Sequence, residues 1–443
     1  MRKHWLLAVL LLCLTSTFSG FYLLHSSRSA LINKFNMAVR LAVPYSTQKA
    51  TTDFTTSLST MTTLQSQKTL FINVSSGEMC NEVSNFVFVK THKTGSTTLR
   101  SLTCRYGYFR NLSFLLGKQG VIGHLNQLNL VWTQNESNLL PPIGVSVEDH
   151  LNHRNYNISN IHVRYNGELI RKLMYRASDL KYFTILRNPT NQWLSQFQYF
   201  GQYRKAGLSL SSLPQTLIRY LKKLKERTGG FNNQLRDLGI HSSIAYNSSW
   251  LNETIPQIDK EYDLVLIMEH FDESLILLKK LLCWSFKDIL YVKKRQQPNP
   301  LKINEATRKE IQKRNVGDEA LYDYFLKVFW SKVEDYGPSF QKDLNQFRRM
   351  LNETWHMCVG KTVAEKSQDN YRYLETYVTD NSSEFCWALV NTNFQMDIEI
   401  VKRQGKTSDD RWPGLLKQSE RKPVVKPQRR FPLRKGYKRK PIH

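Results

Sequence analysis

The sequence predicts an α/β domain with a parallel β-sheet flanked by helices, preceded by one N-terminal transmembrane helix. Three short segments are almost wholly apolar, at residues 85–89, 182–186 and 264–268, and each is followed by a segment with helical periodicity. Strands that are apolar on both faces and alternate with helices are typical of a parallel sheet covered on both sides. Ligands of such sheets bind where strand ends meet helix starts, so the chemistry is expected at these three junctions.

The N-terminal segment supplies the membrane prediction. Residues 5–24 carry no charge and are long enough to cross a bilayer. Arg2 and Lys3 precede them, which predicts a cytosolic tail at residues 1–4 and a lumenal body, as in a type II signal-anchored protein of the Golgi membrane. A cleaved signal peptide is the alternative. Both place the body in the secretory pathway, and so do eight Asn-x-Ser/Thr triplets, at Asn73, Asn111, Asn135, Asn157, Asn247, Asn252, Asn352 and Asn381.

Composition divides the rest of the chain into a stem, a domain and a tail. Residues 25–79 are rich in Ser and Thr and too polar to form a core, which is typical of a stem. Residues 80–400 form the expected lumenal domain. Residues 401–443 carry fifteen Lys/Arg against three Asp/Glu and are expected to be a disordered basic tail. The net charge of +26 would suit nucleic acid, but a lumenal address excludes that partner and favours anionic glycans, membrane head groups or an anionic nucleotide.

Cysteine and histidine spacing limits the disulfides and the metals. Five cysteines lie outside the apolar segment, so an oxidising compartment allows at most two disulfides and one thiol. Proximity in the sequence favours a bridge between Cys358 and Cys386. No spacing typical of metal ligands occurs, and no metal is expected.

The first junction is a loop suited to an anion. It reads Lys-Thr-His-Lys-Thr-Gly-Ser-Thr-Thr-Leu-Arg over residues 90–100. A strand followed by small hydroxyl residues, one glycine and a helix directs backbone N–H groups and the positive helix end toward an anion. A plain turn capped by hydroxyls is the alternative, but Lys90, His92 and Lys93 would be unfavourable at a helix N-terminus without an anion. Lys93 precedes the glycine, so the Walker pattern of P-loop NTPases is absent.

The second junction places an arginine at a strand end. Asn188 is a good helix N-cap and Pro189 a good first helical residue, so Arg187 ends the strand and Ser195 lies about two turns into the helix. Arg187 can offer a planar fork to a phosphate, although an arginine here is often a structural salt-bridge partner. The helix also carries an apolar stripe that Ser195 does not share, made of Trp193, Phe197 and Phe200.

Together these segments resemble the donor site of sulfotransferases that use 3′-phosphoadenosine 5′-phosphosulfate (PAPS). In that site a strand-loop-helix holds the 5′-phosphosulfate, and an arginine with a serine eight residues later holds the 3′-phosphate. The residues at 90–94, 186–189, 231–239 and 264–274 resemble more closely the galactose 3-O-sulfotransferase family, which includes cerebroside sulfotransferase. The likeness runs from about residue 85 to 390 and implies a P-loop-like sulfotransferase fold.

The resemblance implies sulfonate transfer from PAPS to a galactose hydroxyl, with the 3-hydroxyl expected, on a glycolipid or glycoprotein glycan. Lys93 would neutralise charge on the bridging oxygen as adenosine bisphosphate leaves. The implied donor-binding residues are Lys90, Thr94, Gly95, Ser96, Thr97, Thr98, Arg187 and Ser195. Gly95 stands where the family commonly has alanine, a change expected to be harmless. The insert at 120–155 looks longer than usual and could reshape acceptor access.

A histidine is the expected general base for the acceptor hydroxyl. His162 lies in Ile-His-Val-Arg-Tyr-Asn, where the family pattern has a histidine, and we take it as the base on that resemblance. His92 in the donor loop is the second candidate and Glu269 the third. Three alternative functions stay open at this point: a glycosaminoglycan sulfotransferase, a non-catalytic glycan-binding membrane glycoprotein, and a lumenal kinase, which the missing kinase motifs disfavour.

Overall fold

The computed structural model describes residues 80–116, 139–145, 155–162, 164–174, 179–209, 211–224, 230–241, 243–298, 300–366, 372–379, 383–391 and 393–405. The predicted cytosolic tail, transmembrane helix and stem lie outside these ranges, as do most of the insert and residues 406–443. Within the ranges, no helix is both long enough and apolar enough to cross a membrane.

The centre of the domain is a four-stranded sheet in which every neighbouring pair is parallel. Its order is β2 (Ile158–Ser159), β1 (Phe86–Val89), β3 (Lys181–Leu186) and β4 (Leu264–Ile267). The three predicted strands are confirmed, and β2 is added at the edge next to β1. Phe88 stacks on Phe183 with ring centroids 5.4 Å apart, which joins the side chains of β1 and β3 within the core.

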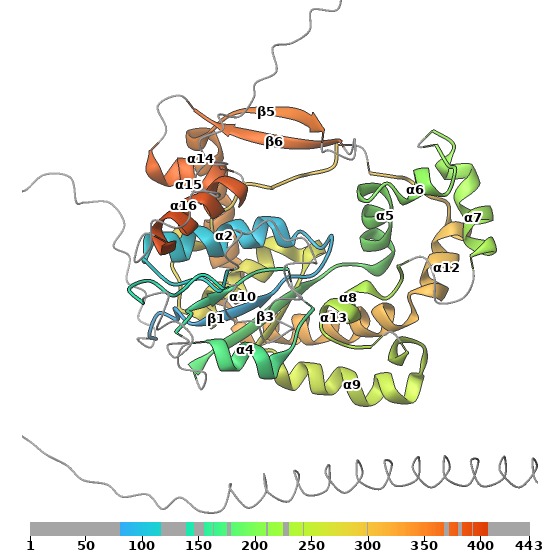
Figure 1. Cartoon of the computed structure of the whole chain (residues 1–443), viewed down its shortest axis with the longest axis horizontal. Helices are drawn as coiled ribbons and strands as arrows, with labels where there is room; N and C mark the ends of the chain where they lie inside the picture. The colour runs from blue at the N-terminus through green and yellow to red at the C-terminus, as the bar shows by residue number, and fades with distance from the viewer. Residues whose placement is uncertain are drawn as a thin grey trace, which may run out of the picture. The chain divides into compact units, whose positions relative to one another are not determined.

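Helices cover both sides of this sheet, so the predicted α/β class is confirmed. In Figure 1, α2 lies on one side of the strands, and α4 and α9 lie on the other. The helices are α2 (Ser96–Phe109), α4 (Gly167–Leu173), α5 (Pro189–Tyr199), α6 (Gln202–Lys205), α7 (Leu213–Lys223), α8 (Asn233–Asp237), α9 (Ser248–Glu261), α10 (Phe271–Leu282), α11 (Phe286–Ile289), α12 (Glu305–Arg314), α13 (Val316–Tyr336), α14 (Ser339–Cys358), α15 (Glu384–Val390) and α16 (Asn393–Gly405), with the short 3₁₀ helices η4 (Ile244–Tyr246) and η5 (Met268–His270).

A second apolar cluster joins α5, α7 and α12, which lie together in Figure 1. The predicted start of α5 is confirmed: the Asn188 side chain accepts the N–H of Asn191, and Pro189 is the first helical residue. The predicted stripe is only partly correct. Trp193 and Phe197 are buried in the cluster, but Phe200 lies at the helix C-cap with 42% of its surface exposed.

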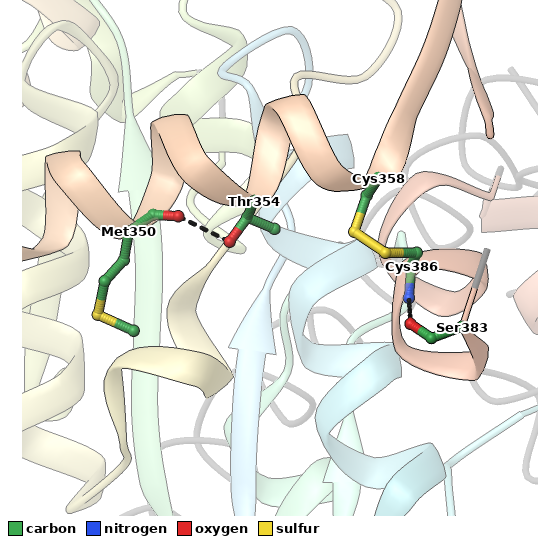
Figure 2. Close-up of a disulfide and its surroundings, with 5 residues drawn as sticks. All are labelled: Met350, Thr354, Cys358, Ser383 and Cys386. Carbon is green, nitrogen blue, oxygen red and sulfur yellow. Dashed lines mark hydrogen bonds between the residues drawn. A yellow bond between two sulfur atoms is a disulfide. The ribbon is translucent and has the colours of Figure 1, made fainter. Parts of the chain in front are cut away.

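An antiparallel hairpin, β5 (Val359–Lys366) and β6 (Arg372–Val378), follows α14 and was not predicted. The predicted Cys358–Cys386 disulfide is confirmed and joins the end of α14 to the first turn of α15 (Figure 2). Ser383 caps α15 by accepting the Cys386 N–H at 3.2 Å, while the Thr354 hydroxyl donates to a carbonyl one turn earlier in α14. A second disulfide joins Cys80 to Cys283, and Cys104 is the buried thiol, as the cysteine count allows.

Helix α16 crosses residue 400, the end of the domain expected from the sequence. Helix α16 continues to Gly405, and the Gln404 side chain bonds both the N–H and the C=O of Phe114. Arg100 of α2 forms two hydrogen bonds with Asp397 of α16, at 2.7 and 3.0 Å. These buried contacts fix α16 on α2, so residues 401–405 continue the helix that packs on α2.

Candidate active site

The candidate site lies at the carboxyl edge of the sheet. Because all four strands are parallel, the residues that follow them meet at one edge. Residues 90–95 follow β1, Arg187 follows β3, and η5 follows β4. His162 follows the unpredicted β2, so it also belongs to this edge. The structure therefore brings the candidate catalytic residues together with the donor loop.

Hydroxyl groups hold the donor loop in shape. The Thr91 hydroxyl donates to the carbonyl of Ile185 on β3 at 2.5 Å and lies 2.7 Å from the Thr94 hydroxyl. The Ser96 hydroxyl donates to the Thr91 carbonyl at 2.6 Å. Thr98 accepts the backbone N–H of Lys294. Three of the side chains predicted to bind the donor therefore form hydrogen bonds within the protein: Thr94, Ser96 and Thr98. A fourth, Thr97, lies half-buried in the first turn of α2.

Two residues of the loop, on either side of Thr94, have an unusual backbone conformation. Lys93 has φ +62° and Gly95 has φ +77°, both in the left-handed region. A β-carbon at Gly95 would lie 2.3 Å from the sulfur of Met268. Alanine at this position would therefore have a strained backbone and would require the Met268 side chain to move, while the expectation that glycine is harmless for the backbone donors stays a prediction. The conformation of Lys93 is one that non-glycine residues adopt at a cost and most often at functional sites.

Lys93 is surrounded by other cations and an aromatic ring. Its ammonium lies 3.7 Å from the centroid of the Tyr199 ring, and Arg187 donates to its backbone carbonyl at 3.0 Å. Arg295 donates to the Tyr199 hydroxyl at 3.2 Å. Desolvation, followed by Arg187 and Arg295, lowers the pKa of Lys93 to about 7. Sequence reasoning missed Arg295 and Tyr199, because neither stands in a motif.

Lys90 adds a fourth positive group to this edge. It is buried, and desolvation, Arg100 and Lys93 together lower its pKa well below the usual lysine value, against a smaller opposing effect of Asp237. Arg100 is itself paired with Asp397. A desolvated lysine among like charges is unfavourable in the charged form, and an anion at the same place reverses that effect.

The two candidate histidines are stacked on each other. The rings of His92 and His162 have centroids 4.1 Å apart and an interplanar angle of 25°. Nδ1 of His92 lies 2.8 and 2.9 Å from the two carboxylate oxygens of Asp237, which also accepts the His92 backbone N–H at 2.6 Å. Gln192 donates to the His92 carbonyl. His92 is therefore fixed through its ring, its backbone N–H and its carbonyl, and its Nδ1 nitrogen faces a carboxylate.

The surroundings of His162 and Glu269 differ from those of His92. Desolvation, then Lys90 and His92, lowers the pKa of His162 well below the usual histidine value, against an opposing hydrogen bond with the Lys90 backbone. Glu269 accepts the N–H of Asn188 at the start of α5 and the hydroxyl of Tyr322 at 3.1 Å. A strongly depressed pKa makes His162 a weak base, and Glu269 is committed to structural contacts.

Residues 231–239, singled out above only for their likeness, support both Arg187 and His92. Asn232 has φ +54°, and its side-chain oxygen accepts N–H groups at the start of α13. Asp318 of α13 in turn accepts two N–H groups of α8, and burial raises its pKa to about 7. Gln234 of α8 bonds both backbone groups of Arg187. Helix α8, which ends at Asp237, is therefore rigidly attached to α13.

Two predicted features remain as predictions. Ser195 lies half-buried on α5, seven residues into the helix, and its contact with a 3′-phosphate is untested. Among the described residues, no three His, Cys, Asp or Glu side chains are grouped to hold a metal ion. The site as described consists of cations, hydroxyls, a histidine pair and one carboxylate.

A cationic strand-loop-helix with a histidine–carboxylate pair beside it defines a group-transfer site for an anionic donor. The model of the family described as Galactose-3-O-sulfotransferase matches residues 2–385, so the chain belongs to this family. The chain is 31% identical to galactosylceramide sulfotransferase from Mus musculus over 306 residues, 66% of this chain and 68% of that protein. It is 32% identical to the Homo sapiens protein of the same name over 290 residues, 62% of this chain and 63% of that protein. It is 28% identical to galactose-3-O-sulfotransferase 2 from Mus musculus over 286 residues, 62% of this chain and 70% of that protein.

Proposed function

We propose that this protein transfers a sulfonate group from PAPS to the 3-hydroxyl of a galactose residue in a glycolipid or glycoprotein glycan. The observation that supports it best is the convergence of Lys90, Lys93, Arg187 and Arg295 on the donor loop. Family membership and the names of the relatives support the galactose acceptor. The fold is then a P-loop-like sulfotransferase fold.

The charge arrangement fits a donor with several anionic groups. Arg187 and Arg295 contribute to the lowered pKa of Lys93, and a bound phosphate or sulfate opposes their effect and favours the charged form of Lys93. Arg187 adds the planar fork that suits a phosphate. The hydroxyls of Thr94 and Ser96 already form hydrogen bonds within the loop. The backbone N–H groups at the start of α2 are therefore the groups proposed to donate hydrogen bonds to the phosphosulfate.

Transfer breaks the bond between sulfur and the bridging oxygen of the donor and forms a bond between sulfur and the galactose oxygen. Lys93 stabilises the charge that develops on the bridging oxygen. The galactose hydroxyl loses its proton to a histidine. We assign this role to His92, because Asp237 accepts the Nδ1 hydrogen and so directs the lone pair of Nε2 to the acceptor. His162 then stays neutral beside it, since a second positive ring 4.1 Å away is unfavourable.

The cellular address proposed from the sequence is the Golgi membrane, with a type II anchor at residues 5–24 and a lumenal catalytic domain. A glycosaminoglycan acceptor is the competing substrate class, which the basic composition also suits. Family membership favours galactose over it. A non-catalytic glycan-binding role is disfavoured, because the described site retains the charged groups that donor chemistry needs.

The test is transfer by the purified full-length chain from ³⁵S-labelled PAPS to a panel of galactosylceramide, lactose, N-acetyllactosamine, a core 1 mucin glycan, heparan and chondroitin. We expect label on galactosides only, at a position that makes the galactose resistant to periodate, since a 3-sulfate blocks both vicinal diols. Label removed by heparinase or chondroitinase would support the competing class. Absence of transfer to every acceptor would refute the enzymatic proposal.

A further inference from the structure

Phe200 is an exposed aromatic residue at the edge of the site. The apolar stripe of α5 continues in sequence through Trp193, Phe197 and Phe200, yet the first two are at most 1% exposed and Phe200 is 42% exposed. An isolated exposed apolar side chain needs no functional explanation. The position of Phe200 is what distinguishes it, because its ring lies next to the ring of His92.

The Phe200 ring connects the proposed base with the cationic cluster. Its centroid is 6.4 Å from that of His92. It meets the Tyr199 ring edge-on, at 5.1 Å and 86°. The Tyr199 ring in turn carries the Lys93 ammonium at 3.7 Å. An acceptor whose hydroxyl lies beside His92 therefore has the Phe200 ring as a neighbouring apolar surface.

The backbone that carries Phe200 is firmly held. Its N–H donates to the Gln196 carbonyl at 3.0 Å, and Gly201, with φ +61°, ends the helix by donating to the Gln198 carbonyl. Trp193, two turns earlier in the same helix, stacks on two other rings of the second apolar cluster. Its ring centroid lies 4.8 Å from that of Phe197 and 4.9 Å from that of Phe231. Such a fixed aromatic surface binds a ligand with little loss of conformational entropy.

We propose that the exposed face of Phe200 is the surface on which the acceptor galactose packs, and that it contributes to the selection of galactose over glucose. This inference rests on the proposed function. Galactose presents its C3, C4 and C5 hydrogens on one face, because its axial 4-hydroxyl points to the opposite face. Glucose lacks this continuous apolar patch. An aromatic ring complements that patch, while the polar edge of the sugar remains available to His92.

The experiment compares full-length Phe200→Ala, Phe200→Trp and wild type, with Phe109→Ala as the matched control. Phe109 is 43% exposed at the end of α2, a comparable exposed phenylalanine outside the site. We measure KM and kcat for methyl β-D-galactopyranoside and methyl β-D-glucopyranoside, and the Kd of adenosine 3′,5′-bisphosphate. In Phe200→Ala we expect KM for the galactoside to rise about 10-fold and the galactoside preference to fall. Phe200→Trp retains both, and bisphosphate binding stays unchanged in all variants.

Three results would overturn the inference. An active Phe200→Ala enzyme with unchanged KM and sugar preference would remove the acceptor role. Equal loss in Phe109→Ala would indicate a general effect of exposed aromatic residues, and weakened bisphosphate binding in Phe200→Ala would indicate a structural role. If wild type transfers no sulfonate to any galactoside, the proposed function fails instead. Saturation-transfer NMR with methyl β-D-galactopyranoside then tests Phe200 directly: binding lost in Phe200→Ala but not in Phe109→Ala supports the surface, and binding retained refutes it.

Discussion

Proton uptake on donor binding is the most direct test of the cationic site. With a pKa of about 7, Lys93 is about one-tenth protonated at pH 8 in the free protein. A bound anion favours the charged form and raises the pKa of Lys93. Binding of adenosine 3′,5′-bisphosphate at pH 8 is therefore expected to take up close to one proton at this residue. Because the pKa is higher in the complex, affinity falls as pH rises above 7, by up to about tenfold per pH unit.

Isothermal titration calorimetry at pH 8 in two buffers of different ionisation enthalpy measures this uptake. The nucleotide adds little to the signal, because the second phosphate pKa is about 6 and both phosphates are already ionised. Lys93→Arg is the control, since arginine stays charged and takes up no proton. Lys90, whose pKa is also lowered, contributes to both proteins, so the difference between them isolates Lys93.

Equal proton uptake by wild type and Lys93→Arg would refute this reasoning. It would mean that Lys93 is already charged in the free protein or lies away from the anion. Weak binding of the bisphosphate by wild type at pH 7 would refute the assignment of the whole loop.

Four further substitutions test the same geometry. Arg187→Lys is expected to lose most of the preference for adenosine 3′,5′-bisphosphate over adenosine 5′-monophosphate, because a point charge cannot replace the planar fork, and an unchanged ratio of Kd values would place the 3′-phosphate elsewhere. His92→Ala is expected to lower kcat by roughly 10²- to 10⁴-fold, and Asp237→Asn to lower kcat with bisphosphate affinity retained. His162→Ala is expected to lower kcat less, and a larger loss of kcat in His162→Ala than in His92→Ala would reverse the two histidine roles.

The three main strands could be predicted because each is an apolar run with a helical pattern behind it. Strand β2 has only two residues, too few to show any pattern. The β5–β6 hairpin mixes charged and apolar residues and has no clear alternation, for example in Val-Gly-Lys-Thr-Val-Ala-Glu-Lys. These elements are specified by pairing with neighbours that lie far away in the sequence, which a local pattern cannot reveal.

Only some residues of the site could be predicted from the sequence. Lys93 and Arg187 stand at strand ends, so the fold class alone places them at one edge. Asp237 lies 145 residues from His92, and Arg295 lies outside the helices and strands in a segment without a motif, so nothing local marks either as part of the site. The preference for His162 over His92 rested on likeness, whereas the contact with Asp237, visible only in the folded chain, supports His92.

Gly95 illustrates how a substitution that looks harmless in sequence can matter in the fold. The left-handed conformation costs an alanine roughly 1 kcal/mol, and its β-carbon would also press on Met268, the first residue after β4. Gly207 has φ +68° with open space around it, so Gly207→Ala carries the conformational cost alone. We expect Gly95→Ala to lower the free energy of unfolding by more than Gly207→Ala in urea titrations, and to weaken bisphosphate binding because the loop shifts. Equal destabilisation by the two substitutions, with bisphosphate affinity intact, would mean that the Met268 side chain moves aside at no cost and that the donor loop tolerates alanine at this position.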